Sequence, residues 1–416
     1  MRAVRARSRA RLACAAVLLL AACASSGARP DLDPIPPDGQ GYALVCGKVL
    51  TVDGDDRIFS PGLILVKEGR IAYVGEKRDV PRGYDVIELD TAWASPGMID
   101  LHSHVHTGSW GDINDSVLPL NPQLRASAGL RPSNPSIRRA CAGGVTTLFG
   151  IPGSGSSLSG FGIVYKTKTR ARFDEIVVRE PGGMKVAQSY NPERGQDLGA
   201  TRAGLGWMLE NLSDRAIGAT RAERDDPALA NLQKVHSKEL PMLIHCAGSD
   251  GFANAARMWK GKYDTRCVLS HGCFDAHFTG PFVVELGAPI NAGPRTMDYF
   301  TTRDGAITGT VQRYLEAGAQ DISVNTDSPV VPQEELFLQG AMSARLGADG
   351  YQMLRACTIH PARVFGLDER VGSLEVGKDA DVVVRSGNPL DPRARVELVL
   401  IDGHIEYDRQ RDGQWF

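Results

Sequence analysis

Short apolar runs alternate along most of the chain with stretches whose apolar residues recur at helical spacing. Helical stretches such as DPALANLQKVHSKEL and TGTVQRYLEAGA separate the runs, and each run has the length and composition of a buried strand. The runs occupy residues 97–102, 144–151, 162–167, 183–188, 241–248, 267–272, 288–293 and 322–327. Eight strand and helix units over about 270 residues predict an α/β chain folded as a (β/α)8 TIM barrel, which typically takes about 250 residues.

The segments on either side of these runs have a different pattern. Residues 42–90 consist of short strand-like segments punctuated by glycine and charged turns, and VGSLEVGKDADVVV and VELVLIDGHIEYD return to this pattern near the C-terminus. We therefore expect both ends of the chain to build one small β-sandwich. The expected boundaries are 42–94 and 367–416 for the two parts of the sandwich and 95–366 for the barrel.

Ionisable side chains lie at or near the ends of several predicted strands, where a polar residue is costly to bury unless it is paired or bound to a metal. They are His102, His104, Lys185, His245, His271 and Asp327. Because the C-terminal ends of the strands form one face of a barrel, we expect these side chains to converge there. Imidazole and carboxylate groups suit Zn²⁺ or a related divalent ion, so the pattern predicts a site for one or two metal ions.

Each of these residues also has an ordinary explanation when it is taken alone. A histidine at a strand end is commonly a hydrogen-bonded structural residue, and the histidines from His102 to His106 would also suit an exposed loop. Lys185 alone would be solvated or paired with an acid, and Asp327 would be a turn residue or a helix N-cap. The occurrence of all six groups in this order favours the metal site.

Several motifs carry a resemblance to a known family. The motifs PGMIDLHSH, GGVTT, GMK, IH, SHG and NTD, with the tail segments TIHPARVFGL and VGSLEVGKDADVVV, resemble the amidohydrolase superfamily of metal-dependent hydrolases. Within it, the chain looks most like the imidazolonepropionase-related branch, which includes dipeptidases and cyclic-amide hydrolases. The resemblance implies the barrel and the sandwich. It also implies that His102 and His104 hold the more buried metal and that His245 and His271 hold a second one.

The same resemblance gives roles to Asp327 and Lys185. Asp327 would bind the first metal and act as general base and then general acid, moving a proton from metal-activated hydroxide to the leaving nitrogen. Lys185, as its carbamate, would bridge two metals. Without the carbamate the site would hold one metal, as in the deaminase and imidazolonepropionase branches. The deaminase branch usually carries a glutamate three residues after His245, where this chain has Gly248, so nucleobase deamination is disfavoured.

Four further residues are candidates for contact with the substrate. His106 lies on the same strand face as His104 but one step further out, and it would otherwise belong to a solvated loop. Tyr190, Arg194 and Arg295 follow strand-like stretches and would line the mouth of the barrel. Arginine suits a substrate carboxylate because its planar fork binds a carboxylate through two hydrogen bonds, although surface salt bridges are the alternative for both arginines.

The N-terminus has the features of an export signal. Five arginines precede a short apolar core that is well under the roughly 20 residues needed to span a membrane. Residues 1–22 are therefore predicted to be a signal peptide, and LAAC resembles a bacterial lipobox that makes Cys23 the lipidated residue. The alternative is an ordinary signal peptide cut nearby. Residues 23–41 read as a flexible tether, and we expect a protein exported and lipid-anchored at the outer membrane, facing the periplasm.

The net charge and the cysteine spacing argue against two further kinds of protein, nucleic-acid binders and proteins with a structural zinc site. Loss of the five N-terminal arginines changes 47 basic residues to 42 against 49 acidic residues, and moves the formal charge from −2 to −7. That balance argues against a nucleic-acid partner. The cysteines beyond Cys23 lack the CxxC pairs of a structural zinc site and are expected to be small buried hydrophobes. They are Cys46, Cys141, Cys246, Cys267, Cys273 and Cys357.

These features predict a metal-dependent amidohydrolase that cleaves a linear or cyclic amide in a small molecule or short peptide. Export favours a dipeptide or an N-acyl amino acid as the substrate, and the chain could form a homo-oligomer. One alternative is an imidazolonepropionase-like cyclic-amide hydrolase with a single metal. Another is a non-catalytic binding lipoprotein on the same scaffold.

Overall fold

The computed structural model describes residues 41–115, 118–194, 201–220, 223–299, 301 and 304–416. The chain divides between Pro34 and Ile35, and all the elements below belong to Ile35–Phe416. The predicted signal peptide, Cys23 and all but the last residue of the predicted tether lie outside the described residues. Among the described helices, none combines the length and the apolar character needed to cross a membrane.

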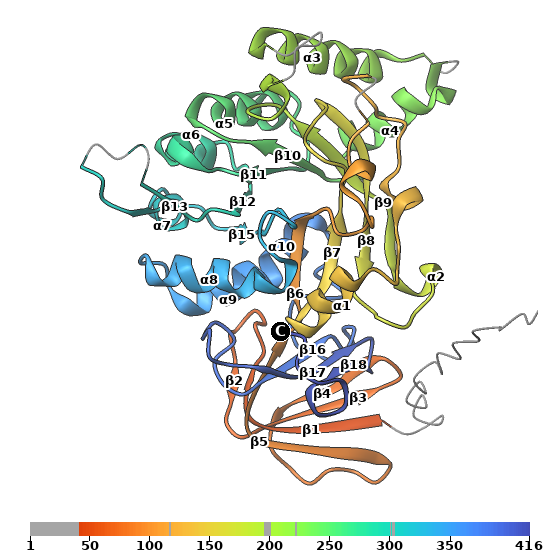
Figure 1. Ribbon diagram of the computed structural model, residues 1–416, viewed down its shortest axis with the longest axis vertical. Coiled ribbons are helices and arrows are strands. Elements are labelled where there is room, and N and C mark those ends of the chain that lie inside the picture. Colours follow the sequence, from red (N-terminus) through yellow and green to blue (C-terminus); the bar gives the residue numbers. More distant parts are fainter. Residues whose placement is uncertain (1–40, 116–117, 195–200, 221–222, 300, 302–303) are drawn as a thin grey trace, which may run out of the picture. The chain divides into compact units, whose positions relative to one another are not determined.

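Within Ile35–Phe416, an eight-stranded sheet forms the barrel (Figure 1). Each of the eight predicted strand runs contains or overlaps one of its strands, so the predicted strand positions are confirmed. From one edge of this sheet to the other, the strands lie in the order β15-β12-β11-β10-β9-β8-β7-β6, so strands that are consecutive along the chain within this sheet are also neighbours in space. The strands are β6 (Met98–Ser103), β7 (Val145–Gly150), β8 (Leu158–Lys166), β9 (Val177–Ala187), β10 (Met242–Cys246), β11 (Cys267–His271), β12 (Ile290–Ala292) and β15 (Ile322–Val324).

One strand of this sheet departs from the prediction. β8 runs antiparallel to both β7 and β9, whereas a (β/α)8 barrel has only parallel strands. The cause is the segment IPGSGSS between β7 and β8, which joins the two strands as a hairpin instead of a helical crossover. The fold is therefore a (β/α)8-like barrel with one reversed strand.

The barrel is nearly closed between its first and last strands. Beyond β15, Ser328 pairs in parallel with Ser103 of β6. The backbone N–H of His104 donates to the carbonyl of Ser328 at 2.9 Å. This seam brings the end of β6 beside the residues that follow β15, as the predicted site requires.

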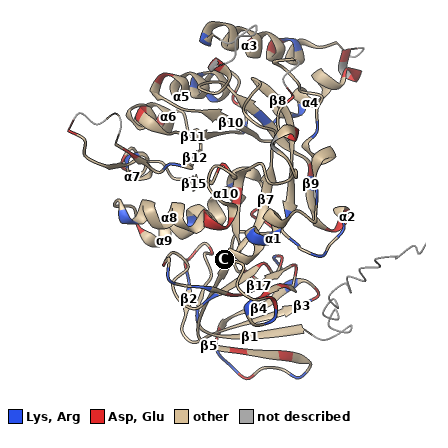
Figure 2. Cartoon of the chain, in the orientation of Figure 1, with Lys and Arg blue, Asp and Glu red and all other residues tan. Residues whose placement is uncertain are grey.

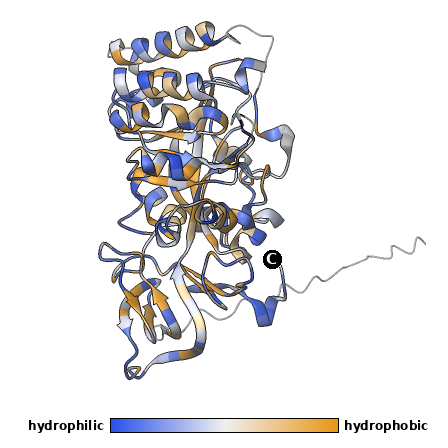
Figure 3. Ribbon diagram, turned by 90° about the vertical axis from the view of Figure 1, so that its left-hand side faces the viewer, coloured by the Kyte–Doolittle hydropathy of each residue, from blue (hydrophilic) through white to orange (hydrophobic). Residues whose placement is uncertain are grey.

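Helices cover the outside of the barrel, and several begin at a side-chain cap. Asn134, Asp226 and Asp349 each accept a hydrogen bond from a backbone N–H in the first turn of the following helix. Figure 3 shows apolar and polar positions mixed along the helices, as expected for one face packed inward. The longer helices are α1 (Pro135–Ala142), α3 (Arg202–Gly218), α4 (Pro227–His236), α8 (Leu336–Arg345) and α9 (Gly350–Cys357).

Shorter elements complete the fold. The short α-helices are α2 (Phe173–Ile176), α5 (Ser249–Ala255), α6 (Gly280–Glu285), α7 (Thr310–Glu316), α10 (Ile359–Phe365) and α11 (Arg409–Asp412). A π-helical turn, η5 (Ala256–Lys262), extends α5. The 3₁₀ turns are η1 (Trp110–Asp112), η2 (Ala126–Gly129), η3 (Pro192–Arg194), η4 (Glu223–Asp225), η6 (Phe274–Thr279) and η7 (Gln333–Glu335). A small hairpin pairs β13 (Met297–Asp298) with β14 (Thr308–Gly309).

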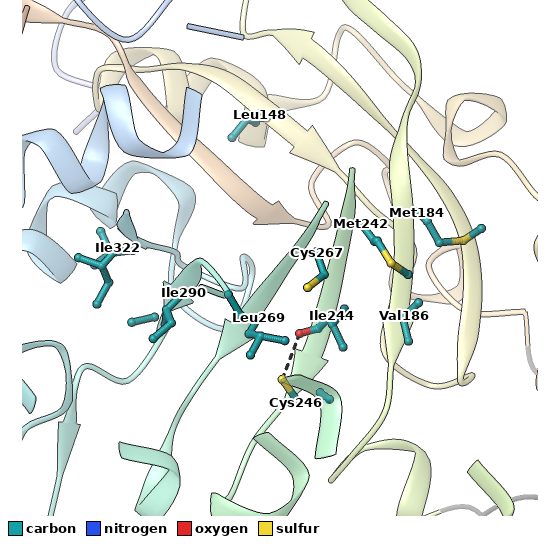
Figure 4. Packing of buried hydrophobic residues seen from close by; sticks show 14 of the residues in the cluster. Leu148, Met184, Val186, Met242, Ile244, Cys246, Cys267, Leu269, Ile290 and Ile322 are labelled. Atoms are coloured by element: carbon teal, nitrogen blue, oxygen red, sulfur yellow. Dashed lines mark hydrogen bonds between the residues drawn. The ribbon is translucent and has the colours of Figure 1, made fainter. Parts of the chain in front are cut away.

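The main core lies between the barrel strands and their helices. Ile244 of β10 and Leu269 of β11 are register partners and are fully buried in it (Figure 4). The alternate residues Leu243 and Val268 belong to a second cluster. The six cysteines predicted to be buried hydrophobes are all buried, and none forms a disulfide in the described part of the chain.

Both ends of the described chain contribute to a second sheet. Its strands follow the order β18-β17-β16-β5-β1-β3-β4, and β2 pairs with β1. The pairing runs through this one sheet, so a sandwich of two sheets stays a prediction. The strands are β1 (Gly41–Leu50), β2 (Ile58–Phe59), β3 (Gly62–Lys67), β4 (Arg70–Glu76), β5 (Tyr84–Pro96), β16 (Val382–Arg385), β17 (Val396–Ile401) and β18 (His404–Asp408).

A buried ion cluster joins this terminal sheet to the barrel. Nζ of Lys166, at the end of β8, lies 3.0 Å from Asp379, 2.7 Å from Asp381 and 3.1 Å from Asp402. Elsewhere the charges are dispersed, with basic and acidic residues interspersed on helices and loops and few on the central strands (Figure 2). The Lys166 cluster is an exception to this dispersed pattern. It forms because the end of β8 places Lys166 beside the three carboxylates.

Candidate metal centre

The end of β6 places two histidines at the centre of the barrel. His102 has no exposed surface and His104 is 7% exposed. Their Nε2 atoms both lie 3.2 Å from Oδ1 of Asp327, which follows β15 across the barrel seam. The seam thus brings together three of the predicted ligands.

The ligand atoms form two overlapping triads. In one, His102, His104 and Asp327 each place a ligand atom within 4.8 Å of the other two. In the other, the ligand atoms of His102, His245 and His271 meet the same limit. His245 and His271 come from the ends of the neighbouring strands β10 and β11. Three imidazoles, or two imidazoles with a carboxylate, are a donor set that suits a divalent metal such as zinc.

Hydrogen bonds on the outer side of the rings fix their orientation. Nδ1 of His104 lies 2.9 Å from the carbonyl of Ile151, and Nδ1 of His271 lies 2.7 Å from the carbonyl of Gly293. A carbonyl can only accept, so each Nδ1 carries the proton and each Nε2 keeps its lone pair. Metal-binding histidines are commonly held in this way. Nδ1 of His102 is held by the Ser270 hydroxyl at 2.7 Å.

Burial keeps these rings in the form that binds metal. Burial lowers the pKa of His102 well below its usual range, and the nearby Lys185 lowers it further. The pKa of His271 is lowered by burial as well. Both rings are therefore neutral near pH 7. Nε2 of His271 is buried without a hydrogen-bond partner in the described structure, and Nε2 of His102 has the Asp327 carboxylate at 3.2 Å but forms no hydrogen bond with it. Buried nitrogens of this kind are costly unless a ligand binds them.

Asp327 faces these rings in its ionised form. Burial opposes the charge on Asp327, but the nearby side chains of His104, His271 and Lys185 hold its pKa below its usual range. Its backbone φ of 48° is in the left-handed region, which few aspartates adopt. Such strain concentrates at functional sites and persists only where the surroundings impose it.

Asp100, which sequence reasoning missed, provides part of that support. Its buried carboxylate accepts hydrogen bonds from the backbone N–H of His102, from the N–H and hydroxyl of Thr326, and from the Gln333 amide, at 2.6–3.0 Å. Burial raises the pKa of Asp100 to about 6. The carboxylate therefore ties the residue before Asp327 to the strand that carries His102. An aspartate inside the apolar run GMIDLH was the available signal.

Lys185 lies in β9 and is fully buried. Its Nζ donates to the Ser154 hydroxyl at 2.8 Å and lies 3.4 Å from the carbonyl of Pro152, both in the β7–β8 hairpin. Burial lowers the pKa of Lys185 to about 7. A substantial fraction is therefore neutral at physiological pH, which is the form that reacts with CO₂. Ser154, in a serine-rich loop, was not predicted as a site residue.

Comparisons with known proteins extend these observations. Residues 216–406 match the Amidohydrolase family. The chain is 23% identical over 393 residues to amidohydrolase tasK of Hapsidospora irregularis, a match that covers 83% of this chain but 40% of tasK. It is 23% identical over 419 residues to an imidazolonepropionase of Sphingopyxis alaskensis, covering 88% of this chain and 96% of that enzyme. A crystal structure of an amidohydrolase from Thermotoga maritima matches with a TM-score of 0.80 and 29% identity, over 88% of this chain and 100% of the other.

The chain is a hydrolase that acts on carbon–nitrogen bonds, and residues 216–406 are similar to the Amidohydrolase family. The resemblance predicted from the motifs is confirmed at the level of the superfamily and of the imidazolonepropionase-related branch. The alternative of a non-catalytic binding protein is accordingly wrong. The two histidine-containing triads of this chain support a bound divalent metal.

The four predicted substrate-contact residues differ in burial and in position. His106 is buried, its Nδ1 has no hydrogen-bond partner in the described structure, and burial lowers its pKa to about 3. It is thus a neutral interior residue and not part of a solvated loop. Tyr190 and Arg295 are exposed and follow β9 and β12. Arg194 ends η3, and its side chain lies outside the described part of the structure.

A cavity adjoins the candidate ligand His104. It has a volume of about 420 Å³, and its walls include Thr107, Ile113, Asn134 and Pro329. That volume lies within the usual range of small-molecule sites. Sequence reasoning did not identify these wall residues, because they come from the long β6–α1 connection and from the turn after Asp327.

Proposed function

We propose that this amidohydrolase cleaves the amide bond of a dipeptide or an N-acyl amino acid with one or two divalent metal ions, zinc being the first candidate. The observation that carries the proposal is the pair of overlapping triads centred on His102. The 420 Å³ cavity beside His104 has room for a substrate of this size.

The residues of the site divide the work between binding and proton transfer. His102, His104, His245 and His271 would hold the metal through neutral imidazole nitrogens. Bound divalent metal would lower the pKa of a water molecule and polarise the amide carbonyl. Asp327, ionised and facing the triads, would accept a proton from the attacking water and deliver it to the leaving nitrogen.

A second candidate is a cyclic-amide hydrolase with a single metal. Similarity to imidazolonepropionase over almost the whole length of both chains favours this reading. The Lys185 amine supports it too, because it is hydrogen-bonded to the β7–β8 hairpin, and an ammonium group would repel a cation. A second metal would need the carbamate of Lys185, in which the lysine nitrogen bonds to the carbon of CO₂ and releases a proton.

Export and lipidation are also part of the proposal. The arginine-rich start, the short apolar core and the LAAC segment support a signal peptide at residues 1–22 and lipidation of Cys23. Anchoring at the outer membrane would expose the enzyme to peptides and acylated amino acids in the periplasm. Mass spectrometry of the N-terminal peptide tests this directly: a diacylated or triacylated Cys23 supports the anchor, and an unmodified cleaved N-terminus contradicts it.

Turnover of defined compounds tests the reaction. The purified protein, reconstituted with Zn²⁺, is assayed against N-acetyl amino acids, dipeptides and an imidazolone, with a lactone and a phosphoester as contrasting substrates. We expect hydrolysis of the amides, loss of activity on chelation and recovery on return of Zn²⁺. Turnover confined to the lactone or the phosphoester would overturn the substrate class.

Metal analysis separates the two candidates. The two-metal reading predicts about two metal ions per chain and an added mass of CO₂ on Lys185 in native mass spectrometry. The single-metal reading predicts about one ion and an unmodified lysine. A protein without tightly held metal would contradict both.

A further inference from the structure

Two aromatic side chains meet where the strands bearing the candidate ligands end. Tyr190 follows β9, the strand of Lys185, and Phe274 begins η6, three residues beyond His271. The ring centroids of Tyr190 and Phe274 lie 5.4 Å apart, with 48° between the ring planes. Three residues span at most about 11 Å of extended chain, so the backbone of Phe274 lies within about 11 Å of the backbone of His271.

Both residues hold backbone conformations that side chains seldom adopt. Tyr190 has φ of 69° and Phe274 has φ of 60°. His271 (80°) and Asp327 (48°), both candidate ligands, share this left-handed region. Strain of this kind concentrates at ligand-binding and catalytic sites. The positions of the two rings are thus imposed by the same set of loops that places the ligands.

Hydrogen bonds tie these loops together. The Ser189 hydroxyl accepts from the backbone N–H of Ala247 at 3.0 Å and donates to its carbonyl at 3.2 Å, which links the residue before Tyr190 to the loop after His245. The loop after β10 is held in turn by Asp275, which accepts from the N–H and hydroxyl of Ser249 at 2.8 and 2.9 Å. The aromatic pair is therefore attached to the three strand ends that carry Lys185, His245 and His271.

Tyr190 and Phe274 are both partly exposed to solvent, unlike the aromatic residues of the core. The side chain of Tyr190 is 43% exposed and Phe274 is partly exposed, although burial of such rings is normally favourable. A fixed aromatic surface at the opening of a site offers contact area to an apolar group at small entropic cost.

We propose that Tyr190 and Phe274 form an aromatic wall that selects amide substrates with an apolar or aromatic side chain next to the scissile bond. The inference rests on the proposed amide hydrolysis and deepens it, because it names the substrate class. The two rings act on binding and specificity, and the metal ligands and Asp327 act on the reacting bond.

Paired substrates test the wall. N-acetylphenylalanine and N-acetylglycine are compared as substrates of the wild type and of Tyr190→Ala, Phe274→Ala and Tyr190→Phe. We expect the wild type to prefer N-acetylphenylalanine, and each alanine variant to lose about tenfold or more in kcat/KM for it, mainly through KM. Turnover of N-acetylglycine should change less than about threefold, and Tyr190→Phe should keep the preference because the ring remains.

Phe278→Ala is the matched control. Phe278 lies in the same 3₁₀ segment, is 64% exposed, and has its ring against His277 at 4.4 Å. Its loss should leave the substrate preference unchanged. Metal content and Tm are measured for every variant, so that a folding defect is recognised. An equal loss of preference in Phe278→Ala, or an unchanged preference in both wall variants, would overturn the inference.

Calorimetric binding of the same two compounds separates this inference from the proposed reaction. If the wild type hydrolyses no amide but binds N-acetylphenylalanine more tightly than N-acetylglycine, and Tyr190→Ala abolishes the difference, the proposed reaction fails and the wall stands. If amides are hydrolysed without any side-chain preference, the reaction stands and the wall fails. If the wild type shows no preference for N-acetylphenylalanine over N-acetylglycine in either the binding assay or the kinetic assay, the aromatic wall is overturned.

Discussion

Asp327 enters the metal centre from a left-handed backbone conformation and is kept ionised by its neighbours. Asp327→Asn retains a carbonyl ligand but removes the proton acceptor. We expect kcat to fall by about 10²–10⁴-fold, the usual contribution of a general base. Because the pKa of Asp327 is below its usual range, the wild type should lose activity only as the pH falls into the acidic range where this carboxylate protonates. The checks are kcat against pH and metal content, and a variant within tenfold of the wild type would contradict the role.

Ser154 supports the buried amine of Lys185 through the 2.8 Å hydrogen bond. Ser154→Ala leaves that amine with the Pro152 carbonyl at 3.4 Å, so we expect a loss of about 1–3 kcal/mol in the free energy of unfolding. We also expect fewer metal ions per chain if the carbamate forms. Ser156→Ala in the same loop is the control, because the Ser156 hydroxyl is buried without a partner in the described structure and its removal should be neutral or stabilising. Denaturant unfolding and metal analysis of both variants decide the matter.

At the scale of single elements, the contact between β12 and β15 depends on one glycine. Gly293 has φ of 134°, and a Cβ there would lie 2.4 Å from the carbonyl oxygen of Asn325. The carbonyl of Gly293 also anchors His271. We expect Gly293→Ala to lower both Tm and metal content. Gly206→Ala in α3 has no atom within 4 Å of the new Cβ and should gain up to about 1 kcal/mol. Equal behaviour of the two variants would contradict this account.

The elements also show what the sequence could and could not reveal. Strand positions and the set of converging ligands could be predicted, because apolar runs ending in histidine or aspartate are local features. The direction of β8 could not be predicted, because a run of buried residues reads the same in either direction. Asp100 and Ser154 were missed because their partners lie 226 and 31 residues away along the chain. His106 was taken for a residue near solvent because its burial depends on packing by distant strands.

At the scale of the whole molecule, the reversed β8 has a structural role beyond the barrel. Its last residue, Lys166, joins the barrel to three carboxylates of the C-terminal segment. Asp379 has two further cations, Arg70 and Arg370. Asp381 is fully buried and pairs with Lys166 alone among the described ion pairs. Loss of Lys166 should therefore leave a buried negative charge without compensation.

We expect Lys166→Met to lower the free energy of unfolding at pH 7 by about 3–5 kcal/mol, the usual effect of removing one partner of a buried pair. Lys168→Met is the matched control: Lys168 reaches Asp402 at 2.6 Å from a less buried position, so its loss should have a smaller effect. Burial opposes the charge of Lys166, but the three carboxylates raise its pKa, so its stabilising contribution is present from neutral pH up to its usual pKa of about 10.4 and is lost as the pH rises through the raised pKa.

The stabilities of the wild type and Lys166→Met should differ in their dependence on pH below 7. Burial opposes ionisation of Asp402, but Lys166 and Lys168 lower its pKa to about 2. A carboxylate with a depressed folded pKa stabilises the protein above its usual pKa of about 3.9, and this contribution is lost as the pH falls toward 2. The wild type should therefore lose stability between pH 4 and pH 2. In Lys166→Met the uncompensated carboxylates take up protons at higher pH, so the difference from the wild type should shrink steadily from pH 7 to pH 3. Denaturant unfolding across this range measures the difference, and a gap that stays constant with pH would show that Lys166 supports the junction by packing and not by charge.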